Sequence, residues 1–308
     1  MKPTNSIRSL IAAVSAVALS TLGAADAAGG KPLEYKHNHW HFSGPFGSYD
    51  KEALQRGFQV YKTVCASCHA VEQLAFRNLG DKGGPFYLAE CPAGVPEGTN
   101  CSIPGENPVV KAIAAEYEIT DGPDDSGDMF KRPGLPSDKF PHPFANPQQA
   151  RAANGGALPP NLALVIKARH HGPDYVYSLL TGYEDAPTAV QLAPNQNYNP
   201  YFAGDLSQNL KPEYRDAEGH PLAGVEVPPG GVLAMKAPLA DGVVDYADPN
   251  IPETVDQYAK DVVEFLTWAS EPKMEQRKSL GIVSMGYLLI LTLLLFFSYR
   301  AIWSKVDH

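Results

Sequence analysis

The chain has 308 residues, and its 25 Lys and Arg against 34 Asp and Glu give a formal net charge of −9 at neutral pH. This acidity argues against nucleic acid as a partner and favours basic partners. The 27 Gly and 28 Pro predict long irregular connections, which argues against a coiled-coil bundle or a Rossmann sheet.

The N-terminus carries the features of an export signal. Seventeen uncharged residues lie between Arg8 and Asp26, after a basic start, and Ala25-Asp26-Ala27 has the small-x-small pattern of a cleavage site. At about 1.5 Å per residue this run is short for a bilayer. We therefore expect residues 1–27 to be a signal peptide, with a retained N-terminal anchor as the alternative.

The segment after the signal, up to residue 49, shows no helical or strand period and is predicted to be an irregular arm. It places His37, His39 and His41 at every second position. On a strand these three imidazoles would share a face, which permits a metal site. No Cys or carboxylate cluster completes such a site, so an exposed or packed polar arm is the preferred interpretation.

A helix is predicted to begin after Asp50, a residue type typical of N-caps, because Leu54, Phe58 and Tyr61 recur at helical steps. This helix leads directly into Cys65. The most informative motif of the sequence therefore follows a helix end.

Cys65-Ala66-Ser67-Cys68-His69 has the spacing of a c-type haem attachment sequence. Two intervening residues let both thiols reach the vinyl groups of one haem, and the adjacent His can bind its iron. A redox dithiol or half of a zinc site are the alternatives. The first needs a βαβ context and the second another Cys or His pair, and the sequence shows neither.

Residues 80–109 are predicted to be a Gly/Pro-rich loop that contains Cys91 and Cys101. In an exported protein these two are expected to form a disulfide, with two free buried thiols as the alternative. A short helix is predicted for 109–118. The run from Glu116 to Asp128 carries six acids and no base and is interpreted as a solvated loop. As the alternative, this run could steer a basic protein partner together with a second acidic run, which consists of Asp241, Asp245, Asp248, Glu253 and Asp256.

Helical periodicity returns at 161–182, with a break expected at Gly172-Pro173, and the stretch 183–250 is rich in Pro, Gly, Asn and Tyr. Thr254 and Gln257 form a capping-box pattern ahead of another helix, which Pro272 is expected to end.

The five methionines allow a sixth iron ligand to be sought by elimination. Met1 leaves with the signal, Met285 lies in the C-terminal apolar run and Met274 lies among charges at its start. Met129 lies within the acidic run, whereas Met235 lies in an apolar, proline-stiffened loop. Met235 is therefore preferred over Met129, although it could instead be a core methionine. A Met ligand raises the reduction potential and blocks the position where O₂ would bind.

The C-terminal run contains 21 uncharged residues between Lys278 and Arg300, about 31 Å as a helix. We expect a single transmembrane span at 279–299. Export by the signal then places the body, 28–272, in the periplasm and leaves 300–308 as a cytoplasmic tail. The predicted location is the inner membrane.

Five segments, taken together and in this order, resemble the cytochrome c1 family of the cytochrome bc1 complex. They are 55–61 (QRGFQVY) before the Cys65 motif, 150–160 (ARAANGGALPP), 167–170 (KARH), 198–202 (YNPYF) and 268–272 (WASEP).

The resemblance implies a mainly α, class I-like c-type cytochrome domain with long loop insertions, plus one C-terminal transmembrane helix. It implies one covalently attached haem c, with Cys65 and Cys68 as thioether sites and His69 and Met235 as axial ligands. It also implies haem-pocket positions at Asn154, Pro160, Arg169 and Tyr175, with Arg169 suited to a propionate. Finally, it implies a close crossing of Gly57 and Tyr61 against Val262 and Phe265.

The resemblance implies a one-electron carrier, not an enzyme on its own, within a dimeric quinol–cytochrome c oxidoreductase. Its partners would be cytochrome b, the Rieske iron–sulfur protein as donor and a soluble c-type cytochrome as acceptor. A stand-alone membrane-anchored cytochrome that serves a terminal oxidase is the alternative. A haem enzyme such as a peroxidase is disfavoured, because the sequence has one attachment motif and a candidate ligand for each side of the iron.

Overall fold

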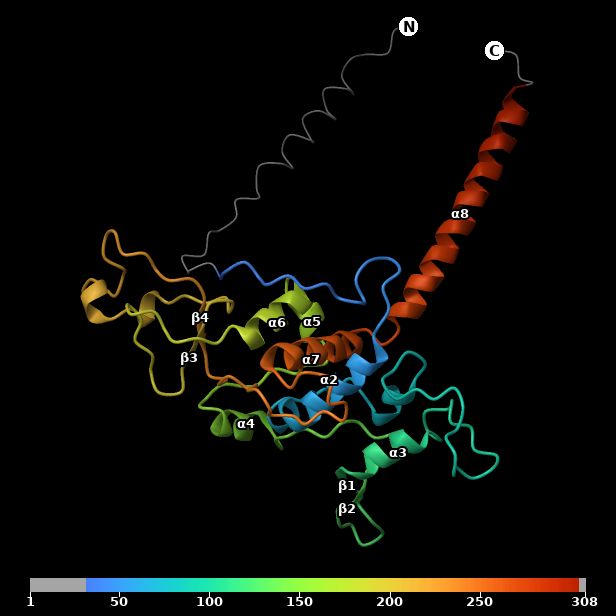
Figure 1. The fold of residues 1–308 in the computed structure, drawn as a ribbon, viewed down its shortest axis with the longest axis horizontal. Coiled ribbons are helices and arrows are strands. Elements are labelled where there is room, and N and C mark those ends of the chain that lie inside the picture. The colour runs from blue at the N-terminus through green and yellow to red at the C-terminus, as the bar shows by residue number, and fades with distance from the viewer. Residues whose placement is uncertain (1–31, 305–308) are drawn as a thin grey trace.

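The structure is a computed structural model that describes residues 32–304, so the predicted signal peptide lies outside the described residues. The helices are α2 (Lys51–Thr63), α3 (Pro108–Ala115), α4 (Pro147–Ala153), α5 (Val165–Ala168), α6 (Gly172–Thr181), α7 (Val255–Ser270) and α8 (Met274–Trp303). The strands are β1 (Glu118–Asp121), β2 (Phe130–Pro133), β3 (Asn197–Asn199) and β4 (Gly231–Leu233). Helices and long irregular connections form the body, and α8 leaves it as a separate rod (Figure 1).

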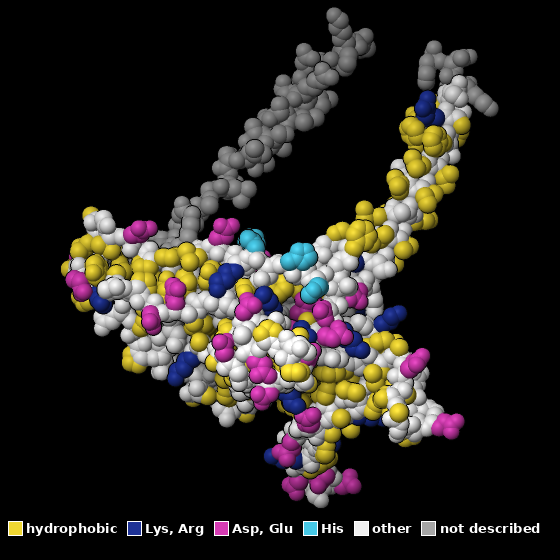
Figure 2. Space-filling model, in the orientation of Figure 1, with side chains coloured by type: hydrophobic (Ala, Val, Ile, Leu, Met, Phe, Trp, Pro, Cys, Tyr) yellow, Lys and Arg dark blue, Asp and Glu magenta, His cyan; other side chains and the backbone are white. Residues whose placement is uncertain are grey.

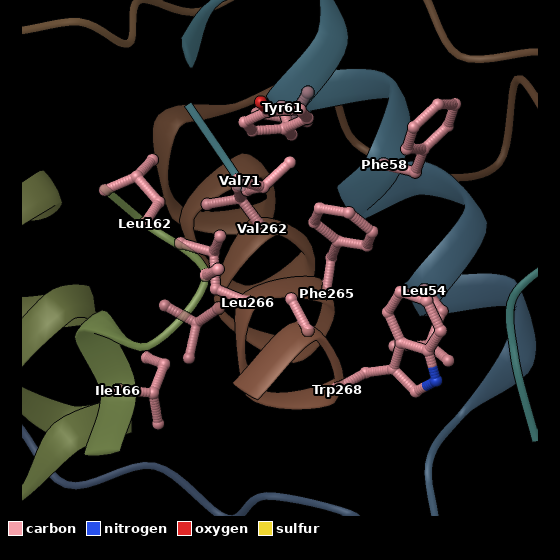
Figure 3. Close-up of a cluster of buried hydrophobic side chains, with 14 of the residues drawn as sticks. Leu54, Phe58, Tyr61, Val71, Leu162, Ile166, Val262, Phe265, Leu266 and Trp268 are labelled. Atoms are coloured by element: carbon pink, nitrogen blue, oxygen red, sulfur yellow. The ribbon is translucent and has the colours of Figure 1, made fainter. Parts of the chain in front are cut away.

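Helix α2 begins where the sequence predicts, because the Asp50 side chain accepts a hydrogen bond from the Ala53 N–H at 3.0 Å. Its predicted apolar positions Leu54, Phe58 and Tyr61 are all buried. They pack with residues of α7 in the main hydrophobic core (Figure 3). The helical period thus identified the buried face of α2 correctly.

Helices α2 and α7 cross closely in the centre of the body (Figure 1), as the resemblance implies. A Cβ atom on Gly57 would lie 2.0 Å from the Asp261 carbonyl oxygen and 2.7 Å from the Phe265 Cβ. The rings of Tyr61 and Phe265 are 5.6 Å apart. Only glycine permits this approach of the two backbones.

A buried ion pair joins the same two helices. The Arg56 guanidinium donates two hydrogen bonds to Asp261, at 2.8 and 2.9 Å, and Asp261 is only 1% exposed. The Tyr246 hydroxyl and the Gln257 amide also donate to this carboxylate. These donors satisfy a charge that would otherwise be costly to bury.

Glu264 of α7 is 2% exposed and accepts one hydrogen bond, from the Asp50 N–H at 3.2 Å. Burial raises its pKa from 4.5 to about 7, and the nearby carboxylates of Asp50 and Asp261 act in the same direction. A carboxyl group whose pKa is raised by folding contributes fully to stability at pH values below its ordinary pKa. This contribution is lost as the pH rises through the pKa of the folded state.

We therefore expect the free energy of unfolding to fall between about pH 4.5 and pH 7, by up to about 3 kcal/mol from this group. Glu264→Gln should remove this part of the pH dependence. Denaturant titrations of both proteins at about pH 5 and about pH 8 measure it. Equal pH dependence in the two proteins would contradict the prediction.

Helix α7 also begins as predicted, with the Thr254 hydroxyl accepting from the Gln257 N–H. The capping box is incomplete, because the Gln257 side chain binds Asp261 instead of returning to Thr254. The helix ends at Ser270, just before Pro272, as expected.

The acidic run is not simply a loop, as the sequence interpretation had it. The preceding helix α3 ends at Ala115, and Glu118 begins strand β1, which pairs antiparallel with β2. The hairpin projects from the side of the body away from α8 (Figure 1). Three acids of the run pair with cations: Glu116 with Lys62, Glu118 with Lys131 and Asp121 with Arg132.

Three further features differ from the sequence interpretation. Helix α4 was not predicted. Gly172-Pro173 begins α6 instead of breaking a helix, with the Pro in its first turn, and the break lies at 169–171. The stretch 183–250 contains the small β3–β4 sheet, which packs with a second cluster of buried residues that includes Val190, Leu206 and Leu210.

Cys91 and Cys101 form a disulfide bond, and Cys65 and Cys68 are free thiols.

The described part of the N-terminal arm, residues 32–49, contains no helix or strand. Helix α8 extends beyond the predicted span 279–299 at both ends, and it is long and apolar enough to cross a membrane.

Candidate haem-binding site

The attachment motif folds as one tight turn at the end of α2. The Cys65 carbonyl accepts hydrogen bonds from the N–H groups of Cys68, at 3.1 Å, and His69, at 2.9 Å. Both thiols and the imidazole are therefore held on a single turn, and both cysteines are partly buried. Burial raises the pKa of the Cys65 thiol to about 12, so this environment favours an uncharged sulfur. A thioether fits that environment.

His69 is oriented by a residue far away in the sequence. Its Nδ1 lies 2.8 Å from the Pro160 carbonyl oxygen. A carbonyl only accepts, so Nδ1 carries the proton and the lone pair of a neutral ring is on Nε2. Burial lowers the pKa of His69, which favours the neutral ring. This is the tautomer that can bind a metal through Nε2.

Two further contacts place Pro160 beside the motif. The Leu162 N–H donates to the Ala70 carbonyl at 2.9 Å, and the Asn161 amide donates to the Gln73 side chain at 2.9 Å. Sequence analysis missed Asn161 and Gln73. No spacing signal could have found them, since 88 residues separate the two.

Asn154 ends helix α4. Its amide donates to the Ala150 carbonyl at 2.7 Å, and its own carbonyl accepts from the Ala157 N–H at 3.1 Å. Gly155 and Gly156 follow with φ of +61° and +92°, a region that favours glycine. Asn154 thus organises the turn that leads to Pro160.

Arg169 and Tyr175 lie together. The phenol of Tyr175 is buried, which raises its pKa, and a hydrogen bond and the charge of Arg169 oppose that rise. The Arg169 side chain itself is exposed, at the break between α5 and α6. A guanidinium in this position can bind a carboxylate through two parallel hydrogen bonds.

Met235 lies two residues after β4 and is partly buried. The Tyr183 hydroxyl donates to its carbonyl at 3.1 Å, and the Asn197 amide donates to the Leu233 carbonyl at 3.2 Å. Met129 is 60% exposed, next to β2 of the hairpin. Met274, which the sequence interpretation places among charges, is in fact buried in the main core at the start of α8.

The donor set fits haem c better than a simple metal ion. Within residues 32–304, no group of three or more His, Cys, Asp or Glu side chains could hold a metal. His37, one of the three arm histidines considered as metal ligands, binds Asp174 with 2.8 Å between its Nδ1 and the Asp174 Oδ2. Two free thiols and one oriented imidazole on a single turn are what covalent haem attachment requires.

Residues 40–306 match the family described as the Cytochrome C1 family. The chain belongs to this family. It is 39% identical to "Cytochrome c1" of Rhodospirillum rubrum over 98% of both chains. It is 41% identical to "Cytochrome c1 1, heme protein, mitochondrial" of Arabidopsis thaliana, over 94% of this chain and 78% of that one.

A third relative is "Cytochrome b/c1" of Bradyrhizobium diazoefficiens, 41% identical over 87% of this chain. This chain spans only 35% of that protein's length. The family confirms a mostly helical cytochrome c1 domain with one long apolar C-terminal helix. It implies electron transfer in the cytochrome bc1 complex.

Proposed function

We propose that the chain carries one covalently attached haem c and transfers single electrons within a cytochrome bc1 complex. The observation that carries the proposal is the geometry of the motif. Two free thiols and an imidazole lie on a single turn. The Pro160 carbonyl holds the Nδ1 of this imidazole, so its Nε2 is available to bind iron. The family and the printed "heme protein" of a relative support the same cofactor.

In this proposal Cys65 and Cys68 would hold the haem through thioether bonds, and His69 and Met235 would bind its iron. The haem iron would supply a centre that gains or loses one electron. Protein ligands on both sides leave no position for O₂ or peroxide, so the chain needs no group that makes or breaks bonds.

The proposed pocket residues act on that centre indirectly. Pro160 fixes the His69 ring through its carbonyl, and Asn154 shapes the turn before it. Arg169 offers a positive charge for a propionate, and the Tyr175 ring stands edge-on to Tyr35 with centroids 5.5 Å apart.

We propose a single-pass protein of the bacterial inner membrane, with 1–27 removed, 28–272 in the periplasm, 279–299 in the bilayer and 300–308 in the cytoplasm. The length and apolar composition of α8 support the span.

The proposed partners are cytochrome b, the Rieske iron–sulfur protein as donor and a soluble c-type cytochrome as acceptor, in a dimeric complex without nucleic acid. The relative named "Cytochrome b/c1" supports the first of these, because its name joins the two proteins.

Three acids of the two predicted acidic runs are available to steer a basic acceptor. Among residues 32–304, the carboxylates of Asp125, Asp128 and Asp245 form no ion pair or hydrogen bond. The other acids of the second run, which extends from 241 to 256, are engaged. Asp241 and Glu253 accept from backbone N–H groups, Asp248 binds Asn250 and Asp256 pairs with Lys260. Figure 2 shows acidic side chains over the projecting hairpin.

Reversing the free charges should slow the reduction of a basic cytochrome c several-fold at low salt and flatten its salt dependence. Asp125→Lys with Asp128→Lys tests the hairpin, and Asp245→Lys tests the second run. Stopped-flow rates over a range of ionic strength are the measurement, with Glu118→Gln in an existing ion pair as control. Unchanged salt dependence in both variants would place docking elsewhere.

The function itself is tested on the full chain purified in mild detergent. Colour that survives denaturation in acidic acetone, together with b-type haem and quinol oxidation that co-migrate, supports the proposal. An extractable pigment or a colourless chain overturns the cofactor. Covalent haem without b-type haem or quinol oxidation indicates the stand-alone anchored cytochrome.

A further inference from the structure

We propose that the loop formed by residues 42–47, here called the 42–47 loop, inserts Phe46 into the headgroup boundary of the bilayer beside α8. Phe46 is 83% exposed, more than any other large hydrophobic side chain that the structure describes, including those of the apolar helix α8. A single exposed apolar side chain is common on protein surfaces, so the inference rests on where Phe46 lies.

The loop is attached to α8 where the apolar stretch begins. The Lys278 ammonium donates hydrogen bonds to the carbonyl oxygens of Phe42, at 2.6 Å, and Gly47, at 2.9 Å. Lys278 is the last charged residue before the uncharged run 279–299. Figure 1 shows the loop beside the base of α8, on the face of the body from which that helix leaves. Phe46, next to Gly47, is therefore at the predicted level of the membrane surface.

The loop is also preorganised. The Gly47 N–H donates to the Gly44 carbonyl, and a Cβ atom on Gly47 would lie 2.1 Å from the Ser43 carbonyl oxygen, so the turn is tightly closed. At its base the buried Phe42 ring stacks on Trp40, with centroids 5.6 Å apart. One phenylalanine thus holds the loop on the body while Phe46 points outward. Insertion requires no ordering of the backbone.

The small size of the contact favours lipid over a protein partner. Phe46 stands between Pro45 and Gly47 in a tight turn, and a single aromatic side chain buries about 150–250 Å². A stable protein interface buries about 800 Å² on each partner. Aromatic side chains are typical of the boundary between headgroups and acyl chains, where insertion reaches about 5–10 Å.

Spin labelling of the full-length chain in phospholipid nanodiscs tests the inference. Phe46→Cys introduces a labelling site, and the unsubstituted chain provides the blank because its own thiols are proposed to be blocked. Collision of the label with dissolved O₂, which partitions into lipid, is compared with collision with a water-soluble nickel chelate. Leu289→Cys in α8 is the lipid control, and Phe130→Cys in the hairpin is the water control.

We expect the O₂-to-nickel ratio at position 46 to exceed that at position 130 several-fold and to approach that at position 289. A ratio equal to that at position 130 overturns the inference. The same measurement is repeated in native membranes. An immobilised label that neither reagent reaches there also overturns the inference and indicates a protein contact. The inference rests on α8 spanning the membrane. If that part of the proposed function fails, the ratio at position 289 is low as well.

Discussion

Met235→Leu is expected to convert the low-spin, sulfur-ligated spectrum of the reduced and oxidised protein into one without a sulfur ligand. The reduction potential should fall by on the order of 0.1 V, part of the ~0.8 V range that axial ligands span, because a Met ligand favours the reduced iron. Leucine nearly conserves the volume of this partly buried side chain, so the fold should survive. Absorption spectra and a redox titration are the measurements.

Met129→Leu is the matched control, since the same change at an exposed position should leave both spectrum and potential unchanged. CO binding to reduced Met235→Leu should appear, because the sixth position opens. An unaltered spectrum in Met235→Leu would exclude this ligand and direct attention to Met129 or a histidine.

Gly57→Ala is expected to destabilise the fold by about 1–3 kcal/mol or more. In an ordinary helix interior the same change stabilises by about 0.5–1 kcal/mol, so the expected sign is reversed. The reason is steric: the new Cβ would lie 2.0 Å from the backbone oxygen of Asp261, and the core between α2 and α7 would have to open. Denaturant unfolding, followed by circular dichroism, measures the loss.

Gly105→Ala is the control for this change, because no heavy atom lies within 4 Å of its added Cβ and its φ is outside the left-handed region. Its stability should stay within about 0.5 kcal/mol of the starting protein, as is usual at surface positions. A stable Gly57→Ala protein would show that the two helices can separate without cost.

The local signals of the sequence were read correctly where few alternatives competed. Asp50 followed by apolar residues at helical steps predicted the start and the buried face of α2. Pro272 predicted the end of α7. The uncharged run 279–299 predicted the core of α8, although the helix continues beyond it, because charged residues remain compatible with a helix outside the apolar region.

Other features were missed because the deciding interactions are not local. The run from Glu116 to Asp128 reads as a loop on charge alone, but cross-strand partners and Lys and Arg counterions make part of it a hairpin. The buried position of Met274 depends on core residues far away in the sequence, so its charged neighbours misled the interpretation.

By itself the sequence determined the thiol–thiol–imidazole spacing, the family and the membrane helix, because each is a property of consecutive residues. Only the tertiary structure decided how His69 is oriented, since the Pro160 carbonyl that binds its Nδ1 lies 91 residues away. It also decided that Met235 is partly buried while Met129 is exposed, and that the exposed Phe46 lies beside α8. Hydrogen bonds and packing between distant segments are set by the fold, and no local pattern encodes them.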